Sequence, residues 1–285
     1  MAKRQRGMTE TKIKKWLKEG RGQGIGIDYK PWLTVQDVPS NGRSHREQGF
    51  KSKREHTLLS DLENQFFNIL EYSPNVSDIR EQYPLLPIEE TIDIADSLGI
   101  EHPMDKSTGV KTVMTTDFLV ILKSGRNTTL KAWTVKYISD LDDDRVMEKF
   151  EIERRYWERQ GVEWSIITEL ESNKTLADNI KFVRSYYDLD TCGLFRNFTP
   201  VQISNYTSQL AQRLCGNNIV VRNVCKNFDK ETGFQDGMSL ALFKHLVITR
   251  QIGVDMKSQM LDLIKPINIT LLIRKVWNLE SMQYE

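Results

Sequence analysis

The chain contains 285 residues with a formal net charge of +1, and its 39% hydrophobic and 28% charged residues are typical of an ordinary globular protein. The length predicts about two domains, and no stretch approaches the roughly 18 consecutive apolar residues that a membrane span requires. No apolar segment follows the basic N-terminus, so we expect neither a membrane span nor a secretory signal.

Positive charge is concentrated in the first part of the chain. Residues 1–55 contain 14 Lys and Arg against 6 Asp and Glu, a local charge of +8 that leaves −7 for the remainder. A basic arm is typical of contact with nucleic acid or an acidic partner, and a solvated tail is the alternative for residues 1–10. We predict a short amphipathic helix over residues 11–19. Residues 20–26 lack the strand and helix that flank a phosphate-binding loop, so we predict a flexible loop there.

An α/β pattern begins at His56. Apolar residues at helical spacing are followed by strand-like runs, and a helix with an acidic N-terminus then precedes a last short strand. The predicted order is a helix (56–74), a strand (76–85), a loop of weak helical character (88–99), two strands joined by a turn (112–122 and 131–138), a helix (140–161) and a strand (163–168).

The composition changes again after residue 170. Helical patterns dominate to about residue 250, and two strand-like runs follow at 253–257 and 267–273. Helices with a late hairpin favour a winged-helix-like unit. The three cysteines form no CxxC pair, so we expect reduced packing thiols of a cytoplasmic protein and no zinc site. These cysteines are Cys192, Cys215 and Cys225.

Two charged residues interrupt strands that are otherwise apolar. Asp117 lies within the strand predicted over 112–122, and Lys136 lies near the end of the strand predicted over 131–138. A charge inside a packed strand is costly unless it is paired, and a hairpin of these strands would bring both residues to one edge of the sheet. Glu63 is the third member, because it shares an apolar stripe of its helix and borders the buried face.

Two carboxylates and a lysine at one sheet edge fit metal-dependent hydrolysis of a phosphodiester. Carboxylate oxygens bind Mg²⁺, which activates water and stabilises charge on the phosphate, and two ions about 4 Å apart could share these tasks. The lysine can orient the water or neutralise developing charge. Each residue also has a structural alternative: Glu63 in a capping box with Ser60, Asp117 in a salt bridge with an arginine, and Lys136 extending to solvent.

Several stretches of the chain resemble one family, the TnsA endonuclease subunits of the heteromeric transposases in Tn-seven-type transposons. The similarity covers nearly all of residues 10–168 in order and spacing, whereas the C-terminal third resembles the family only in general layout. The similar stretches are GRGQGIGIDYKPWLTVQDVPSNGRSHR (20–46), LLSDLENQFF (58–67), DIREQYPLLP (78–87), TTDFLV (115–120), VK (135–136) and EIERRYWERQGVEW (151–164).

The resemblance implies an α/β fold of the restriction-endonuclease type, PD-(D/E)xK, with a mixed sheet flanked by helices and a smaller, mostly helical winged-helix-like domain after it. It places catalytic roles on Glu63, Asp117 and Lys136, with Mg²⁺ as the cofactor, Mn²⁺ as a substitute, and two ions as the expected number. The metal ligands would be Glu63, Asp117 and the main-chain carbonyl of Val135. Thr134 stands where the wider superfamily usually has an acidic residue, and because threonine is a poor ligand it puts the second metal site in question.

The resemblance also implies a division of labour in cut-and-paste transposition. This chain would cut the 5′ strands at transposon ends, a TnsB-like subunit would cut and join the 3′ ends, and a TnsC-like ATPase would control both, in the bacterial cytoplasm and away from membranes. The modest net charge agrees with a partner that supplies end recognition.

Four arginines of the basic segment are candidates for contacts with the DNA backbone, with surface solubility as the alternative. They are Arg21, Arg43, Arg46 and Arg54. His45 and His56 have no second histidine at ligand spacing and receive no role.

We therefore expect three regions: a basic arm with a short helix that packs on or near the nuclease core (1–55), a restriction-endonuclease-like catalytic domain (56–170) and a winged-helix-like partner-binding domain (171–285). Two other functions remain open. A restriction or repair nuclease of the same fold would show its own target-site preference. Thr134 leaves room for a non-catalytic DNA-bound adaptor, although the intact acids and lysine argue against it.

Overall fold

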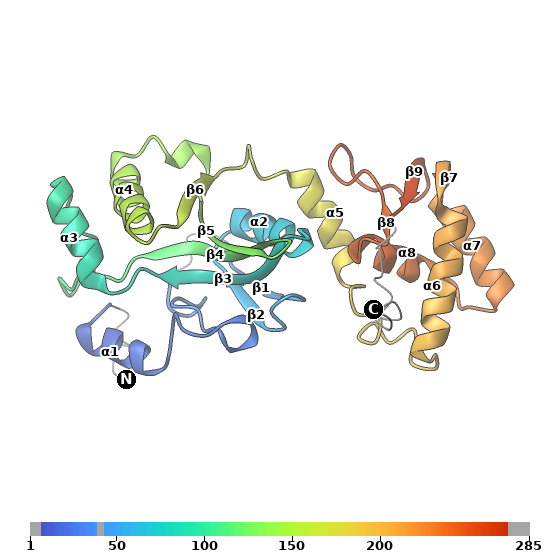
Figure 1. Cartoon of the computed structure of the whole chain (residues 1–285), viewed down its shortest axis with the longest axis horizontal. Coiled ribbons are helices and arrows are strands. Elements are labelled where there is room, and N and C mark those ends of the chain that lie inside the picture. Colours follow the sequence, from blue (N-terminus) through green and yellow to red (C-terminus); the bar gives the residue numbers. More distant parts are fainter. Residues whose placement is uncertain (1–6, 39–42, 273–285) are drawn as a thin grey trace, which may run out of the picture. The chain divides into compact units, whose positions relative to one another are not determined.

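The computed structural model describes residues 7–38 and 43–272 (Figure 1). Contacts divide the chain into two compact units, Met1–Lys174 and Thr175–Glu285. In the part of the chain that is described, no helix combines the length and the apolar character needed to cross a bilayer.

A four-stranded mixed sheet forms the centre of the first unit. Its strands lie in the order β3-β4-β5-β6; the first three run antiparallel to their neighbours, and β6 runs parallel to β5. Helix α4 (Asp144–Arg159) connects β5 to β6, because a parallel neighbour requires a crossover. The strands are β3 (Val76–Pro84), β4 (Thr115–Ser124), β5 (Asn127–Val135) and β6 (Glu163–Ile167).

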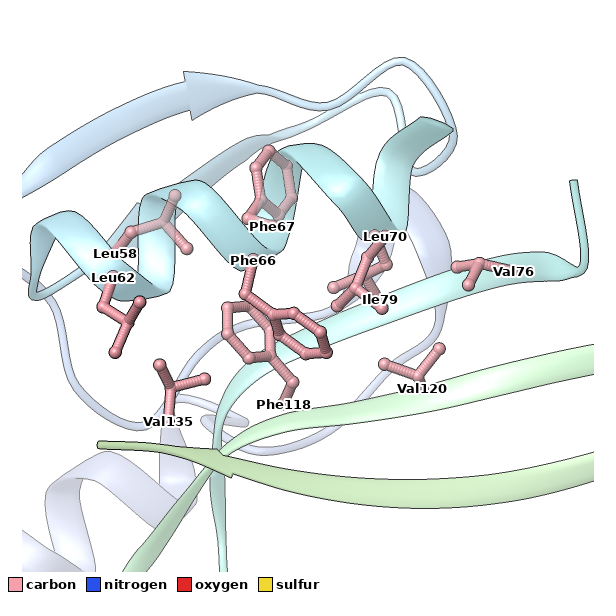
Figure 2. Close-up of a cluster of buried hydrophobic side chains, with 10 residues drawn as sticks. All are labelled: Leu58, Leu62, Phe66, Phe67, Leu70, Val76, Ile79, Phe118, Val120 and Val135. Atoms are coloured by element: carbon pink, nitrogen blue, oxygen red, sulfur yellow. The ribbon is translucent and has the colours of Figure 1, made fainter. Parts of the chain in front are cut away.

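Helix α2 (Asp61–Tyr72) covers one face of this sheet, as Figure 2 shows. Phe66 of α2 meets Phe118 of β4 with ring centroids 5.8 Å apart, and the ring of Trp133 lies 5.5 Å from that of Phe66. The buried cluster on this face consists of Leu58, Leu62, Phe66, Phe67, Leu70, Val76, Ile79, Phe118, Val120 and Val135.

A second cluster forms between the opposite face of the sheet and the helices α3 (Ile88–Leu98) and α4. Leu119 and Ala132, which are paired across β4 and β5, belong to this cluster, whereas Phe118 belongs to the first. Alternation along the strands therefore separates two cores. The predicted fold class, a mixed sheet flanked by helices with a smaller and mostly helical unit after it, is confirmed.

Residues 7–33 form a small core with residues next to the sheet strands. Helix α1 (Glu10–Lys18) buries Trp16, whose ring meets that of Trp32 edge-on at 5.2 Å, and Val113 completes the cluster. A short helix, η1 (Gly26–Asp28), and a two-stranded sheet of β1 (His45–Gln48) and β2 (Glu55–Leu58) follow.

Two local predictions differ from the structure. Residues 56–58 belong to β2 and not to the predicted helix, because Ser60 caps α2 and the helix begins only at Asp61. Residues 88–98, expected to be a loop of weak helical character, form the regular helix α3, which ends at the left-handed Gly99. The paired strands predicted over 112–122 and 131–138 are confirmed as β4 and β5.

As far as residue 272, where its description ends, the second unit contains four helices and a three-stranded antiparallel sheet in the order β7-β9-β8. Helix α8 is its centre: no residue of α8 is exposed. Cys225 is buried, and Cys192 and Cys215 are half-buried free thiols. The elements are α5 (Lys174–Arg184), α6 (Pro200–Leu214), β7 (Gly216–Val220), α7 (Val221–Thr232), α8 (Met238–Ile248), β8 (Ile252–Gly253) and β9 (Pro266–Leu271).

Candidate active site

Glu63 enters the site from the first turn of α2. The hydroxyl oxygen of Ser60 accepts a hydrogen bond from Glu63 N at 3.0 Å, and Oε2 of Glu63 accepts one from Leu59 N at 2.9 Å. The carboxylate therefore binds the residue before the N-cap and not Ser60 N, so the reciprocal bond of a capping box is not made. It is also only 6% exposed and lies 3.2 Å from Nε2 of Gln82 on β3, so it reaches the sheet as well.

Asp117 extends from β4 toward the end of β5. Val135 N donates to its Oδ2 at 2.7 Å, and Gln82 Nε2 lies 3.4 Å from its Oδ1. Among the residues that the structure describes, no arginine pairs with Asp117, so the salt-bridge alternative is not what is found. Because Glu63 and Asp117 contact the same amide nitrogen of Gln82, the two carboxylates lie close together.

Lys136 follows β5 and lines the same cavity as the two acids, an open space of about 620 Å³. Its ammonium group lies 3.1 Å from Asp140 Oδ2, and both side chains are partly exposed. The positive charge of Lys136 also favours the ionised form of Asp117 and so opposes the rise in its carboxyl pKa that burial causes. All three predicted catalytic side chains therefore face one cavity.

The structure adds a third buried carboxylate that the sequence did not reveal. Glu153 of α4 lines the cavity, and its Oε1 accepts hydrogen bonds from Thr116, Thr134 and Trp164. The only signal in the sequence is its place on the buried stripe of an otherwise highly charged helix, beside Tyr156 and Trp157. A carboxylate from α4 thus stands next to Thr134.

Burial dominates the electrostatics of these acids. Desolvation, and next the charge of Asp117, raises the pKa of Glu63 to about 8. Burial also raises the pKa of Asp117 to about 6, against the hydrogen bonds from Val135 N and Gln82 and the charge of Lys136, all of which lower it. Burial raises the pKa of Glu153 to about 7. Carboxylates that are costly to ionise alone become favourable ligands when a cation compensates their charge.

The donor set fits a hard divalent cation. Glu63 and Asp117 share the amide nitrogen of Gln82 and line one cavity, so each can offer a carboxylate oxygen to the same ion. Thr134 does not fit as a ligand, because its hydroxyl donates to Glu153 and accepts from Trp164 Nε1 at 3.0 Å. Within residues 7–38 and 43–272, no group of three or more His, Cys, Asp or Glu side chains has the arrangement of a complete metal site.

The four candidate DNA-contacting arginines separate into two pairs. Arg43 and Arg46 are well exposed, with carboxylates of Asp61 and Glu55 no closer than 3.9 Å. Arg21 is turned inward: it donates to the carbonyl of Trp32 at 2.8 Å and to Asp37 at 2.7 Å.

Arg54 is buried in an ion pair. It donates to both carboxylate oxygens of Glu81, at 2.8 and 2.5 Å, and to the carbonyl of Ile79 at 2.9 Å. His56 Nδ1 lies 2.7 Å from the same carboxylate. Since its guanidinium already serves these partners, Arg54 has no donor placed for a phosphate, and this expectation is corrected: its position is structural.

Comparisons with known proteins agree over both units. The family model described as "TnsA-like endonuclease N terminal" matches residues 73–169, and "TnsA endonuclease C terminal" matches residues 171–256. The chain is 42% identical over 247 residues, 86% of each chain, to "Transposon Tn7 transposition protein TnsA" of Escherichia coli.

Proposed function

Because the chain belongs to the TnsA endonuclease family, we propose that it is the Mg²⁺-dependent DNA endonuclease subunit of a Tn-seven-type transposase. It cuts the 5′ strands at transposon ends, together with a TnsB-like transposase and under the control of a TnsC-like ATPase, in the bacterial cytoplasm. The observation that carries the proposal is the meeting of Glu63 and Asp117 at one buried amide, with Lys136 in the same cavity.

The proposed roles follow from charge and position. Glu63 and Asp117 hold the metal with the main-chain carbonyl of Val135, and Mn²⁺ can replace Mg²⁺ because both accept hard oxygen ligands. A metal ion held there would lower the pKa of a water molecule and stabilise negative charge at the phosphate. Lys136, released from Asp140, orients the water or neutralises charge that develops on the phosphate oxygens.

A second ion is part of the proposal, with Thr134 excluded as its ligand. Glu153 is the nearest carboxylate to Thr134, but its Oε1 already accepts three hydrogen bonds. Ligands for a second ion would therefore come largely from the DNA phosphate, so the second site would fill only when DNA is bound.

The direct test combines the protein with its cognate transposon ends and the partner transposase. Cleavage of 5′ strands in Mg²⁺ or Mn²⁺, and its loss in EDTA, supports the proposal. Sequence-specific cutting by the isolated protein would favour a restriction or repair nuclease, and no cleavage under any condition would favour a non-catalytic adaptor.

Metal binding should depend on pH. Ions bind the ionised carboxylates, and the pKa of Glu63, raised to about 8, means that one proton must leave between pH 6 and 8. The apparent affinity for Mn²⁺ should therefore rise by about tenfold per pH unit. Without metal, the free energy of unfolding should fall as the pH rises from about 4.5 to about 8, because the folded chain keeps a proton that the unfolded chain releases. Titration calorimetry in two buffers of different ionisation enthalpy measures the proton release, and an affinity that is flat with pH would contradict this.

Arg43 and Arg46 are proposed to contact DNA phosphates. Replacing each by glutamine should weaken binding to end DNA and lower the slope of log affinity against log salt by about 0.9 per lost contact. Filter binding or anisotropy between 50 and 200 mM salt measures the slope. The matched control is Arg159→Gln, because Arg159 is an exposed residue at the C-terminal end of α4 that pairs with Asp93. An unchanged slope would show that Arg43 and Arg46 do not contact phosphates and are ordinary surface residues.

For the second unit we propose a winged-helix-like domain that binds a protein partner. The order of its elements from α6 onward is a helix, a strand, two helices and two strands, which supports a winged-helix-like fold. In helix-turn-helix proteins the last of the paired helices lies in the DNA groove and needs exposed polar side chains. Here that helix is α8, and Lys244 lies over the ring of Phe182 at 4.0 Å while His245 Nδ1 lies 2.8 Å from the carbonyl of Tyr186. These contacts of α8 with α5 and the turn after it support a role in binding protein over a role in reading bases.

A further inference from the structure

Gln82 of β3 has a backbone conformation that its sequence does not explain. Its φ is +48°, in the left-handed region that glutamine rarely enters, and its side chain is only 2% exposed. The ladder between β3 and β4 pairs Glu81 with Phe118 and Tyr83 with Thr116 but passes over Gln82. Such a conformation is strained for a non-glycine residue and persists where the surroundings enforce it, often at functional sites.

The N-terminal segment enforces this conformation from outside the sheet. The carbonyl of Gln82 accepts a hydrogen bond from Trp32 N at 3.1 Å, and the carbonyl of Glu81 accepts one from the Tyr29 hydroxyl at 3.0 Å. The side chain of Glu81 is in turn held by Arg54 and His56. Both peptide groups beside Gln82 are therefore fixed by residues that precede α2.

The result is an amide that points between the two acids. Nε2 lies 3.2 Å from Glu63 Oε2 and 3.4 Å from Asp117 Oδ1, while Oε1 accepts from the Thr115 hydroxyl at 3.4 Å. The hydroxyl contact sets the orientation of the amide, with its donor side toward the carboxylates. A neutral donor shared by two carboxylates offsets their repulsion and limits their rotation.

We propose that Gln82 is a positioning residue of the nuclease site, which fixes Glu63 and Asp117 in the geometry that receives the metal ion. This inference rests on the proposed function, because it assumes that these acids are the metal ligands. Partners that hydrogen-bond to metal ligands typically change metal affinity by about 10- to 100-fold when they are removed. Gln82 would act through the acids and not by touching the phosphate.

The test compares Gln82→Met, which keeps the length and the unbranched Cβ, with the parent and with Gln160→Met, which removes an exposed amide bound to Glu90. In calorimetry at fixed pH, Gln82→Met should bind Mn²⁺ about tenfold more weakly, and Gln160→Met should match the parent. In the complete reaction with end DNA and partner transposase, Gln82→Met should need about tenfold more metal for half-maximal 5′ cleavage and recover most of the rate when metal is saturating.

If Gln82→Met fails to fold, Gln82→Asn gives the same comparison, because asparagine tolerates the left-handed region but its shorter amide cannot reach both acids. Parental Mn²⁺ affinity in either variant would overturn the inference, and so would cleavage lost equally at every metal concentration. The proposed function fails separately: if Asp117→Ala cleaves as the parent does, the acids are not the catalytic ligands, whatever Gln82 does.

Discussion

Asp117→Asn should reduce 5′-strand cleavage by about three orders of magnitude or more, while 3′-strand cleavage by the partner transposase continues in the same tube. The substitution keeps the volume and one hydrogen-bond acceptor of the side chain. It removes the negative charge that a divalent ion requires from an acid that Val135 N and Gln82 hold in place. Denaturing gels with each strand end-labelled separately measure the two activities.

Asp93→Asn is the matched control, because Asp93 is exposed and its carboxylate pairs with Arg159 at the surface. It should cleave both strands as the parent does. If Asp117→Asn loses cleavage of both strands, the complex has failed to assemble. A catalytic role of Asp117 would then not explain the loss of 5′ cleavage. Retained 5′ cleavage would remove Asp117 from the site altogether.

Arg54→Ala should lower the free energy of unfolding of the first unit by about 3–5 kcal/mol, which is a large part of the stability of a typical domain. The substitution leaves the carboxylate of Glu81, which has no exposure, without its bidentate partner. Burial raises the pKa of Glu81, but the charges and hydrogen bonds of His56 and Arg54 outweigh it and lower that pKa to about 2. A depressed carboxyl pKa stabilises the fold above the unfolded value of about 4.5, and this contribution is lost as the pH falls toward 2.

Thermal unfolding of the parent, Arg54→Ala and the exposed control Arg43→Ala measures this effect. Arg43→Ala should unfold near the parental temperature, because surface ion pairs contribute little. The double variant Arg54→Met with Glu81→Gln should recover part of the loss, since the buried carboxylate is then removed together with its partner. A fully stable Arg54→Ala that instead changes the salt dependence of DNA binding would make Arg54 a phosphate contact after all.

The sequence was most informative where chemistry and periodicity coincide. Asp117 and Lys136 stand out because each is a charge in an apolar strand, and the hairpin that joins those strands is confirmed. Glu153 could not be found in this way, because it lies among many acids of a charged helix and only its depth in the fold distinguishes it. Gln82 gave no signal either, since a left-handed residue within a strand is enforced by distant contacts and not by its own preference.

Charge counts also failed to separate surface from interior in the basic arm. Arg43 and Arg54 are alike in the sequence, yet one is exposed and the other buried against Glu81. The difference depends on a carboxylate that follows 27 residues later in the chain, which no local pattern reveals. Similarly, residues 56–58 directly precede the helical pattern of α2, and only the long-range pairing of β2 with β1 makes them a strand.

The hydrogen bonds from Tyr29, Trp32 and Arg54 to β3 also determine where the smallest active nuclease fragment can begin. The family model for the N-terminal part matches only from residue 73, but Tyr29, Trp32 and Arg54 fix the strand on which Gln82 lies. A fragment that begins at residue 73 lacks Glu63 itself, and a fragment that begins between Glu55 and Glu63 keeps both acids but loses the hydrogen bonds that fix the backbone on either side of Gln82. Truncation from the N-terminal side should therefore abolish metal binding well before it reaches the first residue that touches the metal.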